Sequence, residues 1–401
     1  MKISKKIQEC ALSPMRKFHP YAVKAEEQGK KIYKLNIGQP DIKTPEQYFD
    51  AVRNFEQPVL AYAPSPGLPE MVNSLVNYYK GIGSNFEAED VIVTTGGSEA
   101  LSILFACILD EGSEVIIPEP FYPNYNTMIR TAGGKITPIH TTPEEGYRYA
   151  VKEKIEACIN ENTRAIMVTN PGNPTGVVLT REEMQVIADI AKEHDIYVIG
   201  DEVYREFVYG GEPLASMSQI KEIEQNVVVV DSVSKRFSAC GARIGALMSK
   251  NKELMGQAMK MAQARLSVAT LDQVASAALY QCDSSYFDAT REEYKKRRDT
   301  CYAMIKKIPG VVCAEPQGAF YMMAALPVDD ADKFNQWLLE EFEDNHETVM
   351  FAPGGGFYTG GKGKNEVRIA YVLKQADLER AMELLGLGIA QYRKEVMGCN
   401  D

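Results

Sequence analysis

The chain has 401 residues, of which 45% are hydrophobic and 25% are charged, which is typical of a globular protein with room for two or three domain-sized units. A formal charge of -11 argues against a nucleic-acid-binding protein, which would need a clustered basic surface. No apolar run has the length of a membrane span, and polar residues interrupt the N-terminal segment, so we expect no signal peptide. The eight cysteines lack paired spacing, which predicts a reduced cytoplasmic protein without disulfides or a metal site.

The first ninety residues contain few regular patterns. Residues 1–35 have no strong period, and the stretches at 13–15 and 19–21 look like an arm or short helix; arms of this kind often pack on a partner subunit. A short strand at 35–37 runs into a turn, and a proline-rich loop follows at 62–67. The spacing of apolar residues then predicts an amphipathic helix over 68–79.

From residue 90 onward, short apolar runs alternate with helical patterns. Strands are predicted over 91–93, 115–117, 165–168, 196–199 and 227–230. Helices are predicted over 98–109 and 181–194. Strands that alternate with helices indicate βαβ units and a mostly parallel sheet.

The pattern changes past residue 250. Long helical stretches are predicted over 251–282 and 286–307, strand-like pieces over 319–325 and 367–372, and further helices over 332–342 and from 375. We therefore predict an α/β protein with a large domain of mostly parallel sheet and helices, residues 46–285. A small α+β domain would come from both chain ends, residues 1–45 and 286–401.

Lys235 is the residue around which the functional prediction is built. It follows the four-valine run 227–230, and ligands bind at the carboxyl ends of the strands in open α/β sheets. Ser232 and Ser234 flank the lysine and Arg243 follows it, so an amine nucleophile lies beside phosphate-binding donors. Such an amine can form a Schiff base with an aldehyde cofactor, whereas a lone loop lysine is usually a solvated surface residue.

A glycine turn precedes the helix predicted from residue 98. Gly97, Ser98 and Glu99 join a strand to a helix, where free N–H groups and the positive dipole end favour an anion. An ordinary N-cap at Ser98 is the alternative. A dinucleotide site would use Glu119 for the ribose, but the third glycine of that motif is missing.

Three polar residues follow two of the predicted strands. Asn173, in a proline-stiffened loop, is suited to donate a hydrogen bond to a phenolate oxygen, and Tyr204 could reach the same oxygen. Asp201 could hold a pyridine nitrogen in its protonated form, which makes the ring an electron sink. A plain turn loop and a helix N-cap at Asp201 are the alternatives.

Two further residues lie far from the lysine in sequence. Arg368 is a charge among apolar neighbours and therefore needs a partner, such as a substrate carboxylate bound at two points. Tyr122 is either a core aromatic or a residue that stacks on a flat ring.

Together these residues resemble the class I/II aminotransferases of the fold-type-I pyridoxal-phosphate superfamily, over roughly residues 30–390. The resemblance implies that Lys235 carries pyridoxal 5′-phosphate as a Schiff base. It implies a phosphate site made by Gly97, Ser98, Glu99, Ser232 and Arg243. It further implies that Tyr122 stacks on the ring, where aspartate-specific members often carry Trp, and that Asn173, Asp201 and Tyr204 polarise it.

The same resemblance implies substrate and subunit contacts. Arg368 would take the α-carboxylate, with Gly38 and Asn173 beside it. Tyr62 would reach across a homodimer to the phosphate in the partner's site. Arg265 is close in sequence to where aspartate enzymes draw a distal-carboxylate arginine from the other subunit, although an exposed helix arginine is the simpler reading.

The implied reaction is ping-pong transamination of an L-amino acid with a 2-oxo acid, of the aspartate/2-oxoglutarate type. Lys235 would move the proton as general acid–base. Aromatic- or alanine-type transamination and a C–S β-lyase on the same fold stay open, because the pocket decides the outcome. A transcriptional regulator on this fold would carry an added DNA-binding domain.

Overall fold

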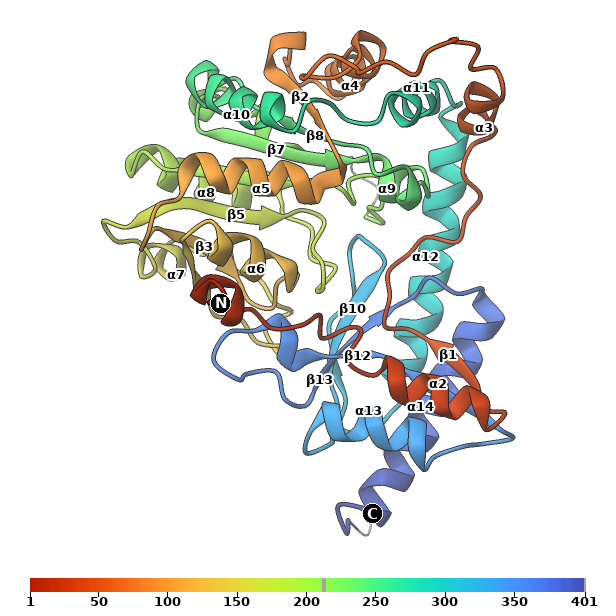
Figure 1. The fold of residues 1–401 in the computed structure, drawn as a ribbon. Helices are drawn as coiled ribbons and strands as arrows, with labels where there is room; N and C mark the ends of the chain where they lie inside the picture. Colours follow the sequence, from red (N-terminus) through yellow and green to blue (C-terminus); the bar gives the residue numbers. More distant parts are fainter. Residues whose placement is uncertain (211–213, 400–401) are drawn as a thin grey trace.

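The computed structural model describes residues 1–210 and 214–399 of the chain and is built around a seven-stranded sheet (Figure 1). The strand order is β2-β8-β7-β6-β5-β3-β4. The strands are β2 (Val91–Thr94), β3 (Glu114–Pro118), β4 (Lys135–Ile139), β5 (Thr163–Thr169), β6 (Tyr197–Asp201), β7 (Val227–Ser232) and β8 (Gly245–Met248). Only β8 is antiparallel to its neighbours, β2 and β7, so the predicted mostly parallel sheet is confirmed.

Two of these strands, β4 and β8, were not predicted from the sequence. β4 is an edge strand with a charged first residue, Lys135, and an internal proline, Pro138, so it lacks an apolar run. β8 is only four residues long and begins with Gly245. β8 is apolar throughout, but Gly, Ala, Leu and Met are not the β-branched or aromatic residues that favour strands.

Helices cover both faces of the sheet. One face packs on α5 (Gly96–Ile108), α6 (Asn124–Thr131) and α10 (Lys252–Ala264). The other packs on α4 (Pro69–Gly81), α7 (Lys152–Glu156), α8 (Arg181–Glu193) and α11 (Thr270–Leu279). In β7, Val227 and Val229 belong to the second face and Val228 and Val230 to the first, as the alternation of side chains along a strand requires. Because both faces are buried, the strand reads as a continuous apolar run.

The helical stretch predicted over 251–282 is two helices rather than one. α10 ends at Ala264 and α11 begins at Thr270. Between them Leu266 has a φ of 74°, a left-handed conformation that interrupts the helix. The apolar spacing continues on both sides of the break, so periodicity alone does not reveal it.

The second unit contains segments from both chain ends, as predicted. Its strands are β1 (Lys31–Lys34), β9 (Val312–Cys313), β10 (Tyr321–Ala325), β11 (Glu347–Met350), β12 (Ala352–Pro353) and β13 (Glu366–Ala370). Its helices are α2 (His19–Glu27), α12 (Ser285–Ile305), α13 (Ala331–Glu340) and α14 (Gln375–Glu395). The strands form an antiparallel sheet, β12-β13-β10-β9, and a parallel pair, β1-β11. The strand predicted at 35–37 therefore lies a few residues earlier. Domain boundaries at residues 45 and 285 stay a prediction.

Short elements complete the chain. They are α1 (Lys5–Gln8), α3 (Glu46–Arg53), α9 (Val233–Arg236) and the 3₁₀ turns η1 (Ala88–Asp90), η2 (Met217–Gln219), η3 (Lys221–Ile223), η4 (Cys240–Ala242) and η5 (Gly354–Phe357). The N-terminal arm runs from α1, beside the large sheet, across the junction of the two units to α2 and β1 (Figure 1). No helix in the described part of the chain is long and apolar enough to cross a membrane. All eight cysteines are free thiols.

Candidate active site

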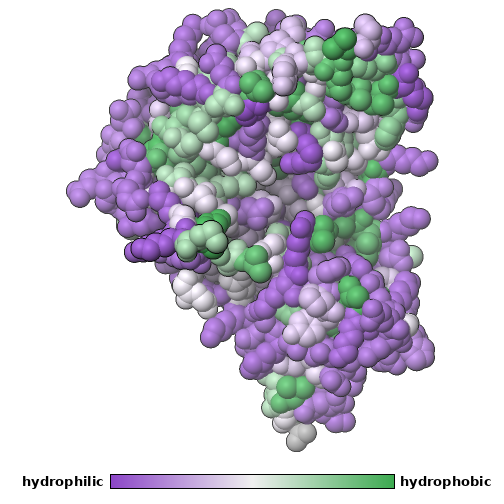
Figure 2. All heavy atoms as spheres, in the orientation of Figure 1, coloured by the Kyte–Doolittle hydropathy of each residue, from purple (hydrophilic) through white to green (hydrophobic). Residues whose placement is uncertain are grey.

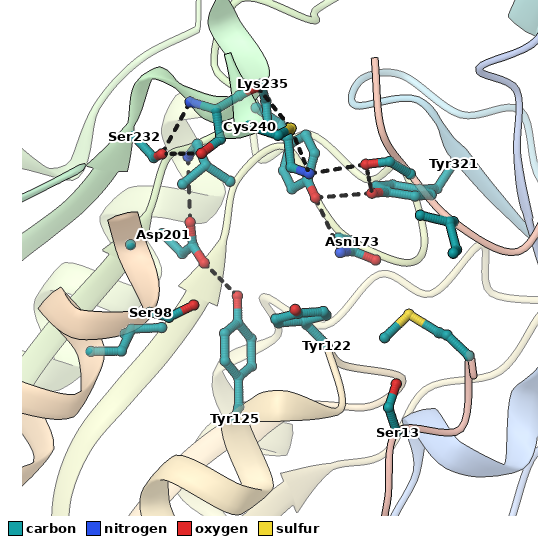
Figure 3. A pocket seen from close by; sticks show the side chains of 18 of the residues that line it. Ser13, Ser98, Tyr122, Tyr125, Asn173, Asp201, Ser232, Lys235, Cys240 and Tyr321 are labelled. Carbon is teal, nitrogen blue, oxygen red and sulfur yellow. Dashed lines mark hydrogen bonds between the residues drawn. The ribbon is translucent and has the colours of Figure 1, made fainter. Parts of the chain in front are cut away.

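A cavity of about 280 Å³ lies at the carboxyl ends of the parallel strands. The space-filling surface is hollowed between the upper and lower parts of the molecule (Figure 2), and Figure 3 shows residues that line the cavity. The residues predicted from the sequence that line it are Gly38, Gly97, Ser98, Tyr122, Asn173, Asp201, Tyr204, Ser232, Lys235, Arg243 and Arg368. The fold thus brings together residues spread over more than three hundred positions of the chain.

Lys235 lies on a one-turn helix, α9, rather than in an irregular loop. Ser232 begins this turn, and its hydroxyl accepts a hydrogen bond from the Ser234 N–H at 3.1 Å. The half-buried Lys235 Nζ donates to the carbonyl of Gly38 at 2.9 Å and lies 3.9 Å from the sulfur of Cys240 (Figure 3). The amine therefore points into the cavity, toward the second unit.

A fully buried ion pair lies beneath the lysine turn. Asp231 accepts a hydrogen bond from Arg236 Nη2 at 2.6 Å, and neither side chain has exposed surface. The hydroxyl of Tyr79 donates to the same carboxylate at 3.0 Å. Since Asp231 and Arg236 sit on either side of Lys235 in sequence, their pairing anchors both ends of the turn.

Several donors converge on one end of the cavity. Arg243 Nη1 donates to the carbonyl of Cys240 at 3.1 Å and lies 3.5 Å from the hydroxyl of Ser234. The N-terminus of α5 lies at the same end, through Gly97 and Ser98. Gly96, with a φ of 71°, approaches Arg243 so closely that a Cβ atom there would overlap the guanidinium. These donors and the positive end of a helix dipole suit a phosphate dianion.

Glu99, Arg265 and Tyr62 are the predicted site residues that do not line this cavity. The Glu99 carboxylate accepts a hydrogen bond from the Thr95 N–H at 2.6 Å and lies 3.5 Å from Arg265 Nε, so it acts as a helix cap. Arg265 also donates to the carbonyl of Val93 at 2.7 Å. Tyr62 is 81% exposed. The predictions for Tyr62 and Arg265 concern a partner's site, so they stay predictions.

Asp201 ends strand β6 and is buried. Its carboxylate accepts hydrogen bonds from the Tyr125 hydroxyl at 2.6 Å and the Val203 N–H at 3.3 Å (Figure 3). It caps no helix, because an irregular turn follows it. Burial raises the pKa of Asp201 to about 6, although both hydrogen bonds act against that rise. A carboxylate held in this way favours a cationic partner in the cavity.

Asn173, Tyr204 and Tyr321 form a hydrogen-bonded group on the next wall. Asn173 Nδ2 donates to the Tyr204 hydroxyl at 3.2 Å, and the hydroxyls of Tyr204 and Tyr321 lie 3.1 Å apart (Figure 3). The Tyr321 hydroxyl also lies 3.5 Å from the Gly38 carbonyl, to which Lys235 donates. The amide and the two phenols therefore share the cavity wall with the lysine amine.

Arg368, on β13, is only 1% exposed and has no carboxylate partner in the described part of the chain. Its Nη2 donates to the carbonyl of Asn36 at 2.7 Å and its Nη1 to Oδ1 of Asn173 at 3.0 Å. Its guanidinium lies 4.4 Å from the ring centre of Tyr321, and its Nε has no hydrogen-bond partner. A buried guanidinium held only by neutral groups has the capacity to bind an anion.

Sequence reasoning missed Tyr125, Tyr321 and the arm residues Ser13, Met15 and Arg16, all of which line the cavity. Tyr321 had a detectable signal. Its strand carries a polar-tipped aromatic among apolar residues, as the Arg368 strand carries a charge. The arm had none, because no periodicity links it to the site.

Comparison with known proteins gives one family for most of the chain. The family model for aminotransferase class I and II matches residues 30–385. The chain belongs to this family. It is therefore an enzyme, an aminotransferase, and the family implies pyridoxal phosphate as cofactor. The lysine amine, the buried carboxylate of Asp201 and the anion cradle at Arg243 fit that group.

Relatives of this aminotransferase extend over nearly its full length. The aspartate aminotransferase of Bacillus subtilis is 32% identical over 393 residues, which cover 96% of this chain and 98% of the relative. The aspartate/prephenate aminotransferase of Thermus thermophilus is 32% identical, over 95% of this chain and 97% of the relative. Among solved structures, the Thermus thermophilus aspartate aminotransferase with maleate has a TM-score of 0.88 at 30% identity, over 97% of this chain and 100% of that chain. The alanine aminotransferase from Pyrococcus furiosus has a TM-score of 0.89, with the same identity and coverage.

Proposed function

We propose that this aminotransferase transfers the amino group of an L-amino acid to a 2-oxo acid by a ping-pong mechanism, with pyridoxal 5′-phosphate attached to Lys235. One observation carries the proposal: a single cavity is lined by the Lys235 amine, the Asp201 carboxylate, the Arg243 cradle and the guanidinium of Arg368, which only neutral groups hold in the described part of the chain. When bound, the cofactor supplies an electron sink that stabilises negative charge at the substrate's α-carbon.

The side chains around the cofactor would divide its binding between them. Phosphate would be held by Ser232, Arg243 and the Gly97–Ser98 turn, with Glu99 capping the helix behind it. Asp201 would keep the ring nitrogen protonated, and the raised pKa of this buried carboxyl favours such a cationic partner. The remaining ring contacts would come from Asn173, Tyr204 and Tyr122.

The substrate would be held by the guanidinium of Arg368 and deprotonated by the neutral amine of Lys235. Arg368 would bind the α-carboxylate with its guanidinium, beside Gly38 and Asn173. Lys235 Nζ would then take the proton from the α-carbon of the amino acid and later return it, as general base and general acid. Its 2.9 Å hydrogen bond to the Gly38 carbonyl keeps the amine close to this carboxylate-binding end.

The substrates would be aspartate and 2-oxoglutarate or close analogues. Relatives named aspartate aminotransferase support this choice. One relative is named aspartate/prephenate aminotransferase and one structural neighbour alanine aminotransferase, so aromatic-type and alanine-type transamination are the alternatives. The third alternative, a C–S β-lyase, would use the same side chains.

The enzyme would work as a cytoplasmic homodimer with its sites at the interface. Apolar side chains gather on the surface over α3 and the segment that follows it (Figure 2). The exposed ones are Phe49, Val52, Val59, Leu60 and Tyr62. Such a patch is typical of a protein–protein interface. From there Tyr62 would reach the partner's phosphate site, and Arg265 would approach the partner's substrate.

A half-reaction screen tests the proposal. Purified holoenzyme is mixed with single amino acids without an acceptor, and the loss of the lysine-bound cofactor's absorbance band is measured. We expect aspartate or glutamate to abolish this absorbance band in a single turnover, with release of one equivalent of 2-oxo acid per active site. Lys235→Ala should lack the band and lose at least about 10⁴-fold in turnover, whereas the exposed control Lys252→Ala should keep both.

Two outcomes would contradict the proposal. If no amino acid changes the absorbance of the holoenzyme, transamination at this site is wrong. If a cysteine conjugate releases pyruvate repeatedly without an amino acceptor while no amino acid removes the band, the enzyme is a β-lyase.

A further inference from the structure

The N-terminal arm forms part of the cavity wall. Ser13, Met15 and Arg16 line the cavity, although they precede the segment matched by the family model. The backbone carbonyl of Met15 accepts a hydrogen bond from Asn36 Nδ2 at 2.9 Å. The sulfur atom of the Met15 side chain lies 3.3 Å from Arg368 Nη2. The arm is thus attached directly beside the guanidinium proposed to bind the substrate's α-carboxylate.

Contacts with both units hold the arm across the cavity. Pro14 lies against Gly356 so closely that a Cβ atom at that glycine would overlap it. At the other end, Glu9 forms an ion pair with Arg130 of α6 at 2.7 Å. These attachments belong to different units and, together with the hydrogen bond at Met15, direct the arm to the cavity edge where Arg16 lies.

Arg16 is the lining cation that the proposed function leaves unused. Within the residues the structure describes, its guanidinium makes no hydrogen bond or ion pair, and the side chain is exposed. Its neighbour Lys17, by contrast, pairs with Asp332 at 3.1 Å outside the cavity. Among the described residues that line the cavity, Asp201 is the only acidic side chain, and it accepts hydrogen bonds from Tyr125 and Val203 rather than from Arg16.

The positive charges of Arg16 and Arg368 both lower the pKa of the Tyr122 hydroxyl. Burial raises the pKa of Tyr122, and the charges of Arg368 and Arg16 both act against that rise. Both guanidinium groups are therefore within Coulombic reach of Tyr122, which lines the same cavity. Of the three arginines that line the cavity, Arg243 is assigned to the phosphate, which leaves the buried Arg368 and the exposed Arg16 for a small ligand.

We propose that Arg16 binds the side-chain carboxylate of a dicarboxylic amino acid whose α-carboxylate is bound by Arg368. The inference rests on the proposed function and deepens it by assigning the substrate class to a residue of the arm. It also offers a candidate other than Arg265, whose guanidinium donates to the carbonyls of Ser65 and Val93 and lies beside Glu99 in its own chain. In residues 1–210 and 214–399, the Arg16 side chain makes no such competing contact.

The test compares Arg16→Met with Lys17→Met in the holoenzyme. Binding of maleate, an unreactive dicarboxylate, and of propionate, an unreactive monocarboxylate, is measured by calorimetry. Half-reaction rates are measured with aspartate and alanine. We expect Arg16→Met to weaken maleate binding and lower kcat/KM for aspartate by about 10- to 100-fold, the range for one lost charge-assisted hydrogen bond. Propionate and alanine should change by less than about 5-fold, as for an uninvolved surface charge.

The controls separate this inference from its alternatives. Lys17→Met should resemble the wild type with all four ligands, and Arg16→Lys should recover part of the preference for aspartate. Unchanged maleate binding in Arg16→Met, or an equal loss with aspartate and alanine, would overturn the assignment. A wild-type enzyme that transaminates only monocarboxylic amino acids would also overturn it while leaving transamination intact. Absence of any absorbance change with any amino acid would instead refute the proposed function.

Discussion

Arg368 Nη1 donates a hydrogen bond to Oδ1 of Asn173 at 3.0 Å, although the two residues are 195 positions apart. A guanidinium can only donate, so this contact turns the amide oxygen toward Arg368 and leaves Nδ2 to donate to Tyr204. The proposed substrate-carboxylate residue and a proposed ring-binding residue are therefore oriented by each other.

This relationship predicts the effect of Asn173→Asp. The new carboxylate would form an ion pair with Arg368 and so compete with the carboxylate of the substrate. The substitution would also remove the Nδ2 group that donates a hydrogen bond to the Tyr204 hydroxyl. We expect KM for the amino acid to rise about 10- to 100-fold, measured in steady-state kinetics. Asn345→Asp, on the exposed surface, is the matched control. An unchanged KM in Asn173→Asp would show that the pair does not tune substrate binding.

The raised pKa of Asp201 predicts that the free energy of unfolding of the cofactor-free protein decreases as the pH rises. A carboxyl with a folded-state pKa of about 6, above its ordinary value of 3.8, binds protons more tightly in the folded state. Its stabilising contribution is complete below pH 3.8 and is lost as pH rises through 6. At pH 7 the ionised Asp201 therefore costs up to about 3 kcal/mol of unfolding free energy.

Asp201→Asn tests this cost. Without cofactor, we expect the free energy of unfolding of the variant, measured in urea at pH 7.5, to be about 1–3 kcal/mol higher than that of the wild type. This difference should shrink as the pH falls toward 4. With cofactor, turnover should fall by about 10²- to 10³-fold because the charge facing the ring is lost. A stability difference independent of pH would refute the burial of an ionised carboxylate here.

Gly96→Ala should damage the phosphate end of the site. The residue has a φ of 71°, and its new Cβ would overlap the guanidinium of Arg243. We expect cofactor affinity to fall about 10- to 100-fold in equilibrium titrations, because Arg243 must move from the cradle. Gly241→Ala is the control, since no atom lies within 4 Å of its added Cβ. Equal affinities in the two variants would contradict the proposed role of Arg243.

Asp231→Ala should destabilise the whole large unit. It leaves Arg236 buried without its carboxylate partner, which costs about 3–5 kcal/mol. Asp288→Ala removes an exposed pair with Arg291 and should change the unfolding free energy by less than about 1 kcal/mol. Urea unfolding of both variants measures the difference. A loss at Asp231 no larger than at Asp288 would contradict an anchoring role beneath Lys235.

The parts of the fold that were predictable are those that leave a local pattern. The valine run of β7 and the amphipathic helix at α4 follow from the periodicity of apolar residues. The edge strand β4 contains a proline and the four-residue β8 has no β-branched residue, so both were missed. The break at Leu266 was missed because its left-handed conformation has no signature in the apolar spacing.

The amino-acid sequence by itself determined the alternation of strands and helices, the order of the polar segments after the strands, and the chemistry that a lysine among phosphate-binding donors can support. Periodicity and turn-forming residues act between near neighbours, so their effects can be inferred from the sequence alone. Only the tertiary structure decided that Asn173 meets Arg368, that Tyr125 holds Asp201 and that Arg16 lies at the cavity's edge. Those contacts depend on strand order, register and the path of the arm, which distant side chains select together and no local pattern records.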